Sequence, residues 1–234
     1  GERMYKNLEL IDKNTDINMG IKEVKNLSYA KGQLSAPVTV AEFYEACKDY
    51  PIVFTKDVSD SWMATVMLGY QENENLFIDE DDQWKKQKYI PAYIRRYPFI
   101  YINTDNTQLT LGIEGSYKSE AKEDESRKLF DKDGNNSEFL NGVLGFLNQF
   151  HADALSTSAF IKQLDEWELL EQKVANITSA DGKSHTLNGF FIVNEEKLKH
   201  LSQKKKDAIC EKNAMPLITA HLISLSNIYK LSLV

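Results

Sequence analysis

The stretch that decides the fold contains two β-forming runs, Pro98-Phe99-Ile100-Tyr101-Ile102 and Leu109-Thr110-Leu111-Gly112-Ile113. Between them lies the polar stretch Asn103-Thr104-Asp105-Asn106-Thr107. A strand, a polar turn and a second strand in this order predict a β-hairpin. The connection is too short for a crossover helix, so we expect the two strands to be antiparallel.

Short β-forming runs continue on the N-terminal side of this hairpin. Residues 52–54 and 62–70 are rich in β-branched and aromatic side chains. Before them, Thr39 and Glu42 have the spacing of a capping box, which predicts the start of a helix that Pro51 ends.

Helical patterns dominate after residue 136. Apolar side chains repeat at three and four residues over 139–150, and a second such face covers 160–170. A hairpin-like insertion follows over 173–193, and two further helical segments end the chain. Strands followed by helices predict an α+β fold, in which a mostly antiparallel sheet from the N-terminal half packs against helices from the C-terminal half.

The same patterns predict the organisation of the chain. We interpret residues 1–3 as an expression scar and residues 4–234 as one domain. Its strand-rich part covers 25–114 and its helix-rich part 136–234, with a polar loop at 115–128 between them.

Composition excludes several classes of protein. The 234 residues carry 28 Lys and Arg against 35 Asp and Glu, a formal net charge of −7. We expect no nucleic-acid partner, because polyphosphate repels an acidic protein. The basic run Lys204-Lys205-Lys206 is the local exception and is typical of a solvated surface. No stretch approaches about 18 consecutive apolar residues, so we expect no integral membrane segment. No secretion signal is recognisable, which favours a cytoplasmic location.

No motif for a metal or cofactor is present in the sequence. The four histidines lack ligand spacing, and no Gly-rich phosphate loop occurs. Cys47 and Cys210 are expected to be buried, reduced thiols. We therefore predict no metal site and no cofactor.

The densest candidate chemistry lies between Pro91 and Pro98. Each proline disfavours helix in the residue before it, which favours an extended segment. Alternation along a strand then places Tyr93, Arg95 and Tyr97 on one face and Arg96 on the other. Such a cationic and aromatic strip suits a carboxylate, a phosphate or a peptide backbone. The alternative is that one arginine pairs with a core carboxylate and the other lies in water.

A second candidate is His221, which lies on an apolar helix face among Ile218, Leu222 and Leu225. It is either a core residue with satisfied nitrogens or a ligand-binding group. Its near-neutral pKa would suit general acid–base chemistry in the second case.

Several segments together resemble the bacterial SapC family, in the family's order over about residues 30 to 230. These segments are Asp49–Phe54, Leu68–Tyr70 with Glu74–Ile78, Tyr89–Phe99, Leu129–Gly134, Leu187–Leu198 and Ala220–Asn227. The resemblance implies a bacterial protein named from surface-layer loci, for which it supplies no catalytic residue and no cofactor.

Residues and resemblance together favour a non-catalytic binding or accessory protein. It would handle a peptide or protein client for surface-layer or export systems, with Tyr93, Arg95, Arg96, Tyr97 and His221 as ligand-binding residues. The alternatives are an enzyme that modifies peptides or proteins, with arginine and His221 in one cleft, and a structural surface-layer component. The sequence leaves the oligomeric state open.

Overall fold

Three antiparallel sheets make up the strand part of the protein, which the computed structural model describes over residues 3–104, 108–120 and 127–234. The protein is mixed α+β, with 37% helix and 26% strand, as predicted. The predicted turn at 105–107, residues 121–126 of the predicted polar loop and the first two residues of the predicted scar lie outside the described residues.

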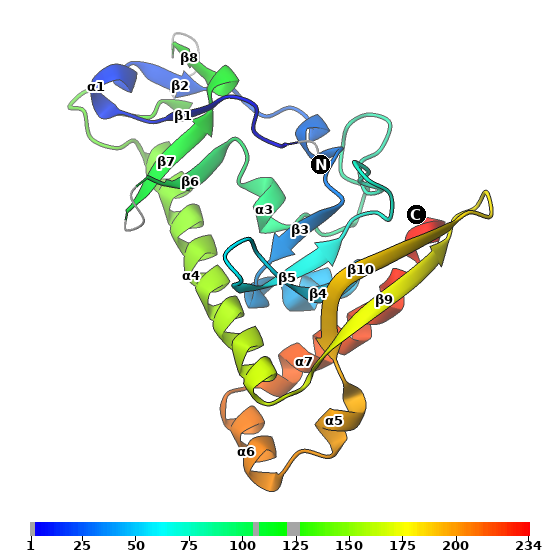
Figure 1. Ribbon diagram of the computed structural model, residues 1–234. Helices are drawn as coiled ribbons and strands as arrows, with labels where there is room; N and C mark the ends of the chain where they lie inside the picture. The colour runs from blue at the N-terminus through cyan, green and yellow to red at the C-terminus, as the bar shows by residue number, and fades with distance from the viewer. Residues whose placement is uncertain (1–2, 105–107, 121–126) are drawn as a thin grey trace.

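The largest sheet has five strands in the order β3-β5-β4-β10-β9. Two of its strands come from the second half of the chain, so the predicted insertion is part of the main sheet. The bounds are β3 (Ser35–Val38), β4 (Ile52–Lys56), β5 (Trp62–Met67), β9 (Leu170–Thr178) and β10 (Ser184–Val193). In Figure 1 the β9–β10 hairpin extends from this sheet as an arm.

The predicted hairpin forms the centre of a second sheet, with the order β1-β7-β6. Strand β6 (Phe99–Asn103) pairs with β7 (Leu109–Glu114), and Phe99 lies opposite Ile113. Strand β1 (Leu8–Leu10) covers the other edge of β7. A third, two-stranded sheet joins β2 (Met19–Ile21) to β8 (Lys118–Glu120). The described part of the predicted polar loop is therefore ordered, because it supplies a 3-10 turn at Gly115–Tyr117 and strand β8.

One long helix, α4 (Glu138–Glu166), runs past both larger sheets (Figure 1). It carries the apolar face predicted over 139–150 and the part of the second face up to Glu166, so two expected helices form one continuous helix. The predicted second face extends too far, because Leu170 begins strand β9. Leu140 and Leu147 near its start belong to a core beneath the three-stranded sheet. Ile161 and Leu164 near its end belong to the larger core beneath the five-stranded sheet. Helix α4 therefore joins the two cores.

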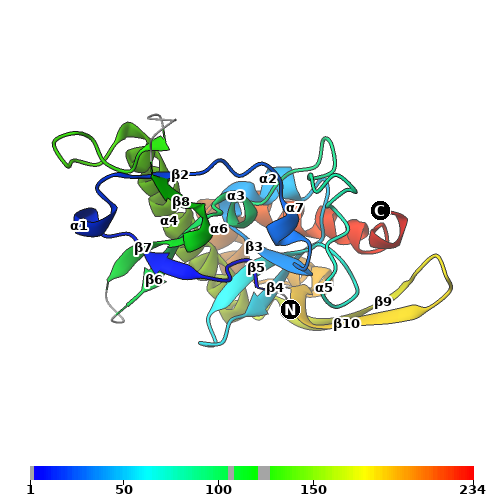
Figure 2. The ribbon, with the colours of Figure 1, turned by 90° about the horizontal axis from the view of Figure 1, so that it is seen from above.

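Shorter helices connect and cover the sheets, and Figure 2 shows several of them from above. Their bounds are α1 (Lys13–Asp16), α2 (Phe43–Ala46), α3 (Ala92–Arg95), α5 (Glu195–Lys199), α6 (Gln203–Glu211) and α7 (Ala214–Ser224). The predicted capping box is confirmed before α2, where the Glu42 carboxylate accepts the Thr39 N–H at 2.8 Å. Both cysteines are free, but Cys210 is exposed and Cys47 is only half-buried, so the predicted burial of both is wrong.

The segment between Pro91 and Pro98 is not extended as predicted. It contains the helical turn α3, in which Pro91 occupies the N-cap position. The prolines restrict only the residues directly before them, so residues 92–96 are free to turn. The Glu42 carboxylate also accepts the Ala92 N–H at 2.7 Å and caps this turn from a distant part of the chain.

Buried polar side chains near the C-terminus connect the last helical segments to β4. Ser224 lies at the end of α7 and Asn227 in the 3-10 turn after it, and both bind the backbone of residues 47–52. The Ser224 hydroxyl accepts the Ile52 N–H at 2.9 Å, and the Asn227 amide donates to the carbonyls of Cys47 and Tyr50. Residues 49–54 and 220–227, two of the segments that resemble the SapC family, therefore contact each other.

Replacing Ser224→Ala leaves the buried Ile52 N–H without an acceptor. We expect the free energy of unfolding to fall by about 1–3 kcal/mol. Ser226→Ala is the matched control, because that exposed hydroxyl contacts only the Ile223 carbonyl. Urea denaturation measures both variants, and equal stabilities would contradict the structural role of Ser224.

Candidate functional site

Three of the four arginines of the chain stack on one aromatic row of α4. Their guanidinium carbons lie 4.8, 5.4 and 5.5 Å from the ring centroids in the pairs Arg127–Phe139, Arg95–Phe146 and Arg96–Phe150. The three rings are seven and four residues apart, so they share one side of the helix. Because an α-helix rises 1.5 Å per residue, the row spans about 16 Å.

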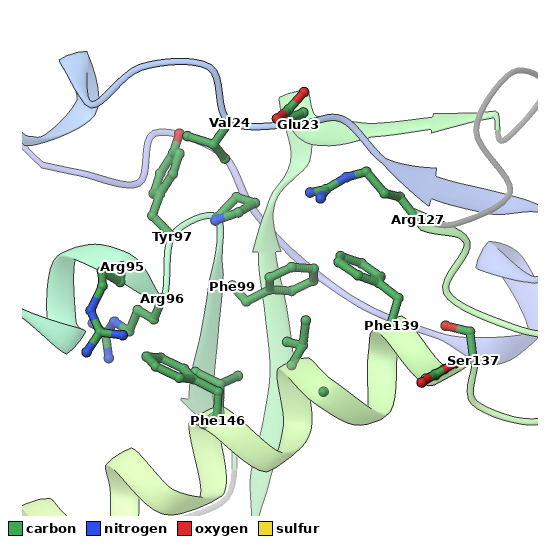
Figure 3. A pocket seen from close by; sticks show the side chains of 15 residues that line it. Glu23, Val24, Arg95, Arg96, Tyr97, Phe99, Arg127, Ser137, Phe139 and Phe146 are labelled. Carbon is green, nitrogen blue, oxygen red and sulfur yellow. The ribbon is translucent and has the colours of Figure 1, made fainter. Parts of the chain in front are cut away.

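A cavity of about 900 Å³ lies between α4 and the segment from Arg95 to Phe99. We call it the arginine groove, because Arg95, Arg96 and Arg127 all line it. Figure 3 shows Arg95 and Arg96 at one end and Arg127 at the other, with Phe99 between them. The groove therefore has a guanidinium group at each end above an apolar floor, with Glu23 and Glu138 also among its lining residues.

Arg95 is held in place by a chain of hydrogen bonds that ends in the core. Its Nε donates to the Ile90 carbonyl at 3.0 Å, and its Nη2 donates to the Tyr89 hydroxyl at 3.3 Å. Tyr89 in turn donates to the Glu42 carboxylate at 2.8 Å. Burial and the charge of Glu42 raise the pKa of Tyr89 to about 12, so this hydroxyl keeps its proton.

Arg96 is held mainly by aromatic faces. Its guanidinium lies 4.3 Å from the centroid of the Tyr93 ring on one side and packs on Phe150 on the other. Its Nε is buried and has no hydrogen-bond partner among the described residues. The side chain therefore keeps hydrogen-bonding capacity that the protein itself does not use.

Arg127 fixes the opposite end of the groove. Its Nε donates to the Ile21 carbonyl at 2.7 Å, and its Nη2 donates to the Lys22 carbonyl at 3.3 Å. Both acceptors are neutral backbone groups. Arg127 therefore joins the β2 segment to α4, and no ion pair with a carboxylate of the described residues is recorded for it.

No carboxylate of the described residues forms an ion pair with Arg95, Arg96 or Arg127. The recorded ion pairs among those residues all use lysine. The alternative in which one arginine pairs with a core acid is therefore wrong for this part of the chain. Three guanidiniums in one cavity, none of them paired with a carboxylate within residues 3–104, 108–120 and 127–234, make it a suitable site for an anionic group.

The predicted site residues are only partly brought together. Arg95, Arg96 and Tyr97 line the arginine groove, whereas Tyr93 lines a separate cavity beside Met4 and Tyr5. The predicted strand face of Tyr93, Arg95 and Tyr97 does not exist, because α3 turns these side chains in different directions.

His221 is a core residue and does not line the groove. It is 0% exposed, its Nδ1–H donates to the Ile52 carbonyl at 2.7 Å, and its Nε2 accepts the Val193 N–H at 3.0 Å. Both nitrogens are thus occupied by backbone groups of β4 and β10. The expected ligand-binding role of His221, and the enzyme hypothesis that places it with arginine in one cleft, are wrong.

The sequence prediction missed Arg127 and the aromatic row. Two sequence features could have indicated them. Only four of the 28 basic residues are arginine, and Phe139, Phe146 and Phe150 have the spacing of one helix face. Among the residues that the structure describes, no three His, Cys, Asp or Glu side chains gather in a way that would hold a metal ion. Over the same ranges, no helix is both long and apolar enough to cross a membrane.

The fold and the groove define an α+β protein with an arginine-lined, apolar-floored cavity. The family model for SapC matches residues 11–231, so the chain belongs to the SapC family. No curated protein sequence matches the chain, and no solved structure does.

The buried state of His221 predicts a pH dependence of stability. Burial disfavours the imidazolium and lowers the pKa of His221 from 6.5 to about 4. Below pH 6.5 the unfolded chain therefore binds a proton that the folded chain does not bind until about pH 4. The free energy of unfolding therefore keeps its full value above pH 6.5 and falls by about 3 kcal/mol as the pH decreases from 6.5 to about 4.

Replacing His221→Gln removes this titration. We expect the loss of stability between pH 7 and pH 4 to be about 3 kcal/mol smaller in this variant than in the wild type. Urea denaturation at several pH values measures it, with the exposed His200→Gln as control. An unchanged pH dependence in His221→Gln would contradict the neutral, buried imidazole.

Proposed function

We propose that this SapC-family protein is a non-catalytic binding protein that holds a peptide segment or protein client through a client carboxylate. The observation that carries this proposal is the gathering of Arg95, Arg96 and Arg127 in one cavity without a carboxylate partner among the described residues. The SapC family is named from surface-layer loci, which suggests surface-layer or export systems as the source of such a client.

The chemistry of the groove supports a peptide over other anions. Guanidinium groups bind carboxylates through two parallel hydrogen bonds, which fixes both position and orientation. The floor offers Phe99, Phe139 and Val143 to apolar side chains of a client. A nucleic acid fits poorly, because the whole chain carries a net charge of −7.

The dimensions and the rigidity of the site support the same proposal. Its volume of about 900 Å³ lies within the range of cavities that bury small ligands or several side chains. Arg95 is oriented before a ligand arrives, through Tyr89 and Glu42. A side chain that is already ordered loses less conformational entropy on binding. The two free cysteines support our proposal of a reducing, cytoplasmic compartment.

The proposal is tested with a fluorescein-labelled peptide of alternating leucine and glutamate, seven residues long and blocked at both ends. We expect the full chain to bind it at least tenfold more tightly than the same peptide with glutamine in place of glutamate. Arg95→Gln should weaken binding of the glutamate peptide about tenfold, since a charge-assisted hydrogen bond contributes about 1.5–3 kcal/mol.

Fluorescence anisotropy measures these affinities, and a thermal melt confirms that Arg95→Gln is folded. Lys204→Gln in α6 is the matched control, because it removes one exposed positive charge away from the groove. Equal binding of the two peptides, or an equal loss from Lys204→Gln, would refute carboxylate recognition by the groove.

A further inference from the structure

The two ends of the arginine groove differ in charge. Glu23 and Glu138 line the groove together with Arg127, and Glu138 is the first residue of α4. Figure 3 shows Glu23, Arg127 and Ser137 on the side of the groove away from Arg95 and Arg96. One end therefore carries two carboxylates and one guanidinium, whereas the other carries two guanidiniums.

The cation at the mixed end is less available to a ligand than those at the other end. Arg127 already donates to two backbone carbonyls and packs on Phe139. Glu23 and Glu138 are exposed, and no ion pair or side-chain hydrogen bond is recorded for either carboxylate among the described residues. The mixed end is therefore suited to a cationic group and the Arg95–Arg96 end to an anionic one.

Helix geometry fixes the distance between the two ends. Arg95 stacks on Phe146, which is eight residues after Glu138, and this corresponds to a separation of about 12 Å along α4. An extended peptide rises about 3.3 Å per residue, so the same distance covers four residue steps. Residues i, i+2 and i+4 of an extended peptide point to the same side.

We propose that the groove selects an extended client segment with an acidic residue and a basic residue four positions apart and an apolar residue midway. The acidic side chain binds at Arg95 and Arg96, the basic one at Glu23 and Glu138, and the apolar one lies on the floor at Phe99 and Phe139. This inference rests on the proposed function, and it adds the class of sequence that the site recognises.

Two blocked, fluorescein-labelled peptides test the inference, one with the sequence Glu-Gly-Leu-Gly-Lys and one with Glu-Gly-Leu-Gly-Glu. We expect the wild-type chain to bind the Glu/Lys peptide at least fivefold more tightly than the Glu/Glu peptide. In Glu138→Lys the preference should reverse, and Glu23→Lys should change it in the same direction. The second variant lies outside any helix, so it remains informative if Glu138→Lys weakens α4.

Glu166→Lys is the matched control, because it makes the same charge change at the distant, exposed end of α4 and should leave the preference unaltered. Equal binding of both peptides to the wild type, with a loss in Arg95→Gln, would overturn the inference and leave the proposed function intact. Binding of neither peptide, together with no binding of the longer glutamate peptide, would overturn both. A reversal in Glu166→Lys would attribute the preference to net charge and also overturn the inference.

Discussion

The buried carboxylate of Glu42 accepts hydrogen bonds from the Thr39 backbone, the Tyr89 hydroxyl and the Ala92 N–H. A buried carboxylate is costly unless its oxygens are satisfied, so these donors must stay in place once the protein has folded. Two of them belong to the segment that carries Arg95 and Arg96. The position of the arginines is therefore a consequence of how one acid is accommodated in the core.

A second constraint holds the sheet on which this arrangement rests. His221 binds the backbone of β4 through one nitrogen and that of β10 through the other. Three of the segments that resemble the SapC family thus meet at the His221 imidazole, namely residues 49–54, 187–198 and 220–227. His221 and Ser224, the polar residues of the last helix that resembled candidate site residues, stabilise the fold, whereas the arginine groove lies beside the N-terminal part of α4.

Local patterns predicted the parts of the fold that depend on local interactions. The β6–β7 hairpin follows from two β-forming runs and a short connection, and the turn before α2 follows from Thr39 and Glu42. The turn α3 was missed because its cap, Glu42, lies fifty residues earlier in the chain. The continuity of α4 was also missed, although neither glycine nor proline interrupts residues 146–166.

The candidate site was also predicted only in part, because local sequence patterns do not show contacts between residues that are distant in the chain. The adjacent arginines 95 and 96 were visible as a dense motif, but the flanking prolines led to the prediction of a strand, whereas the structure forms the turn α3. Arg127 is one of several basic residues in a polar stretch, and only the tertiary fold brings it to Phe139. For His221, spacing identified the apolar face, but no sequence pattern shows that both nitrogens meet backbone groups.

The central claim is that the arginine groove binds a carboxylate-bearing peptide through Arg95 and Arg96. The most direct measurement is the two-dimensional NMR spectrum of the arginine Nε–H groups, because the chain has only four arginines. Adding the blocked leucine–glutamate peptide should shift the signals of Arg95 and Arg96 and leave that of Arg3, which lies outside the groove, in place. Unchanged signals from Arg95 and Arg96 at peptide saturation, or a shift confined to Arg3, would contradict the account.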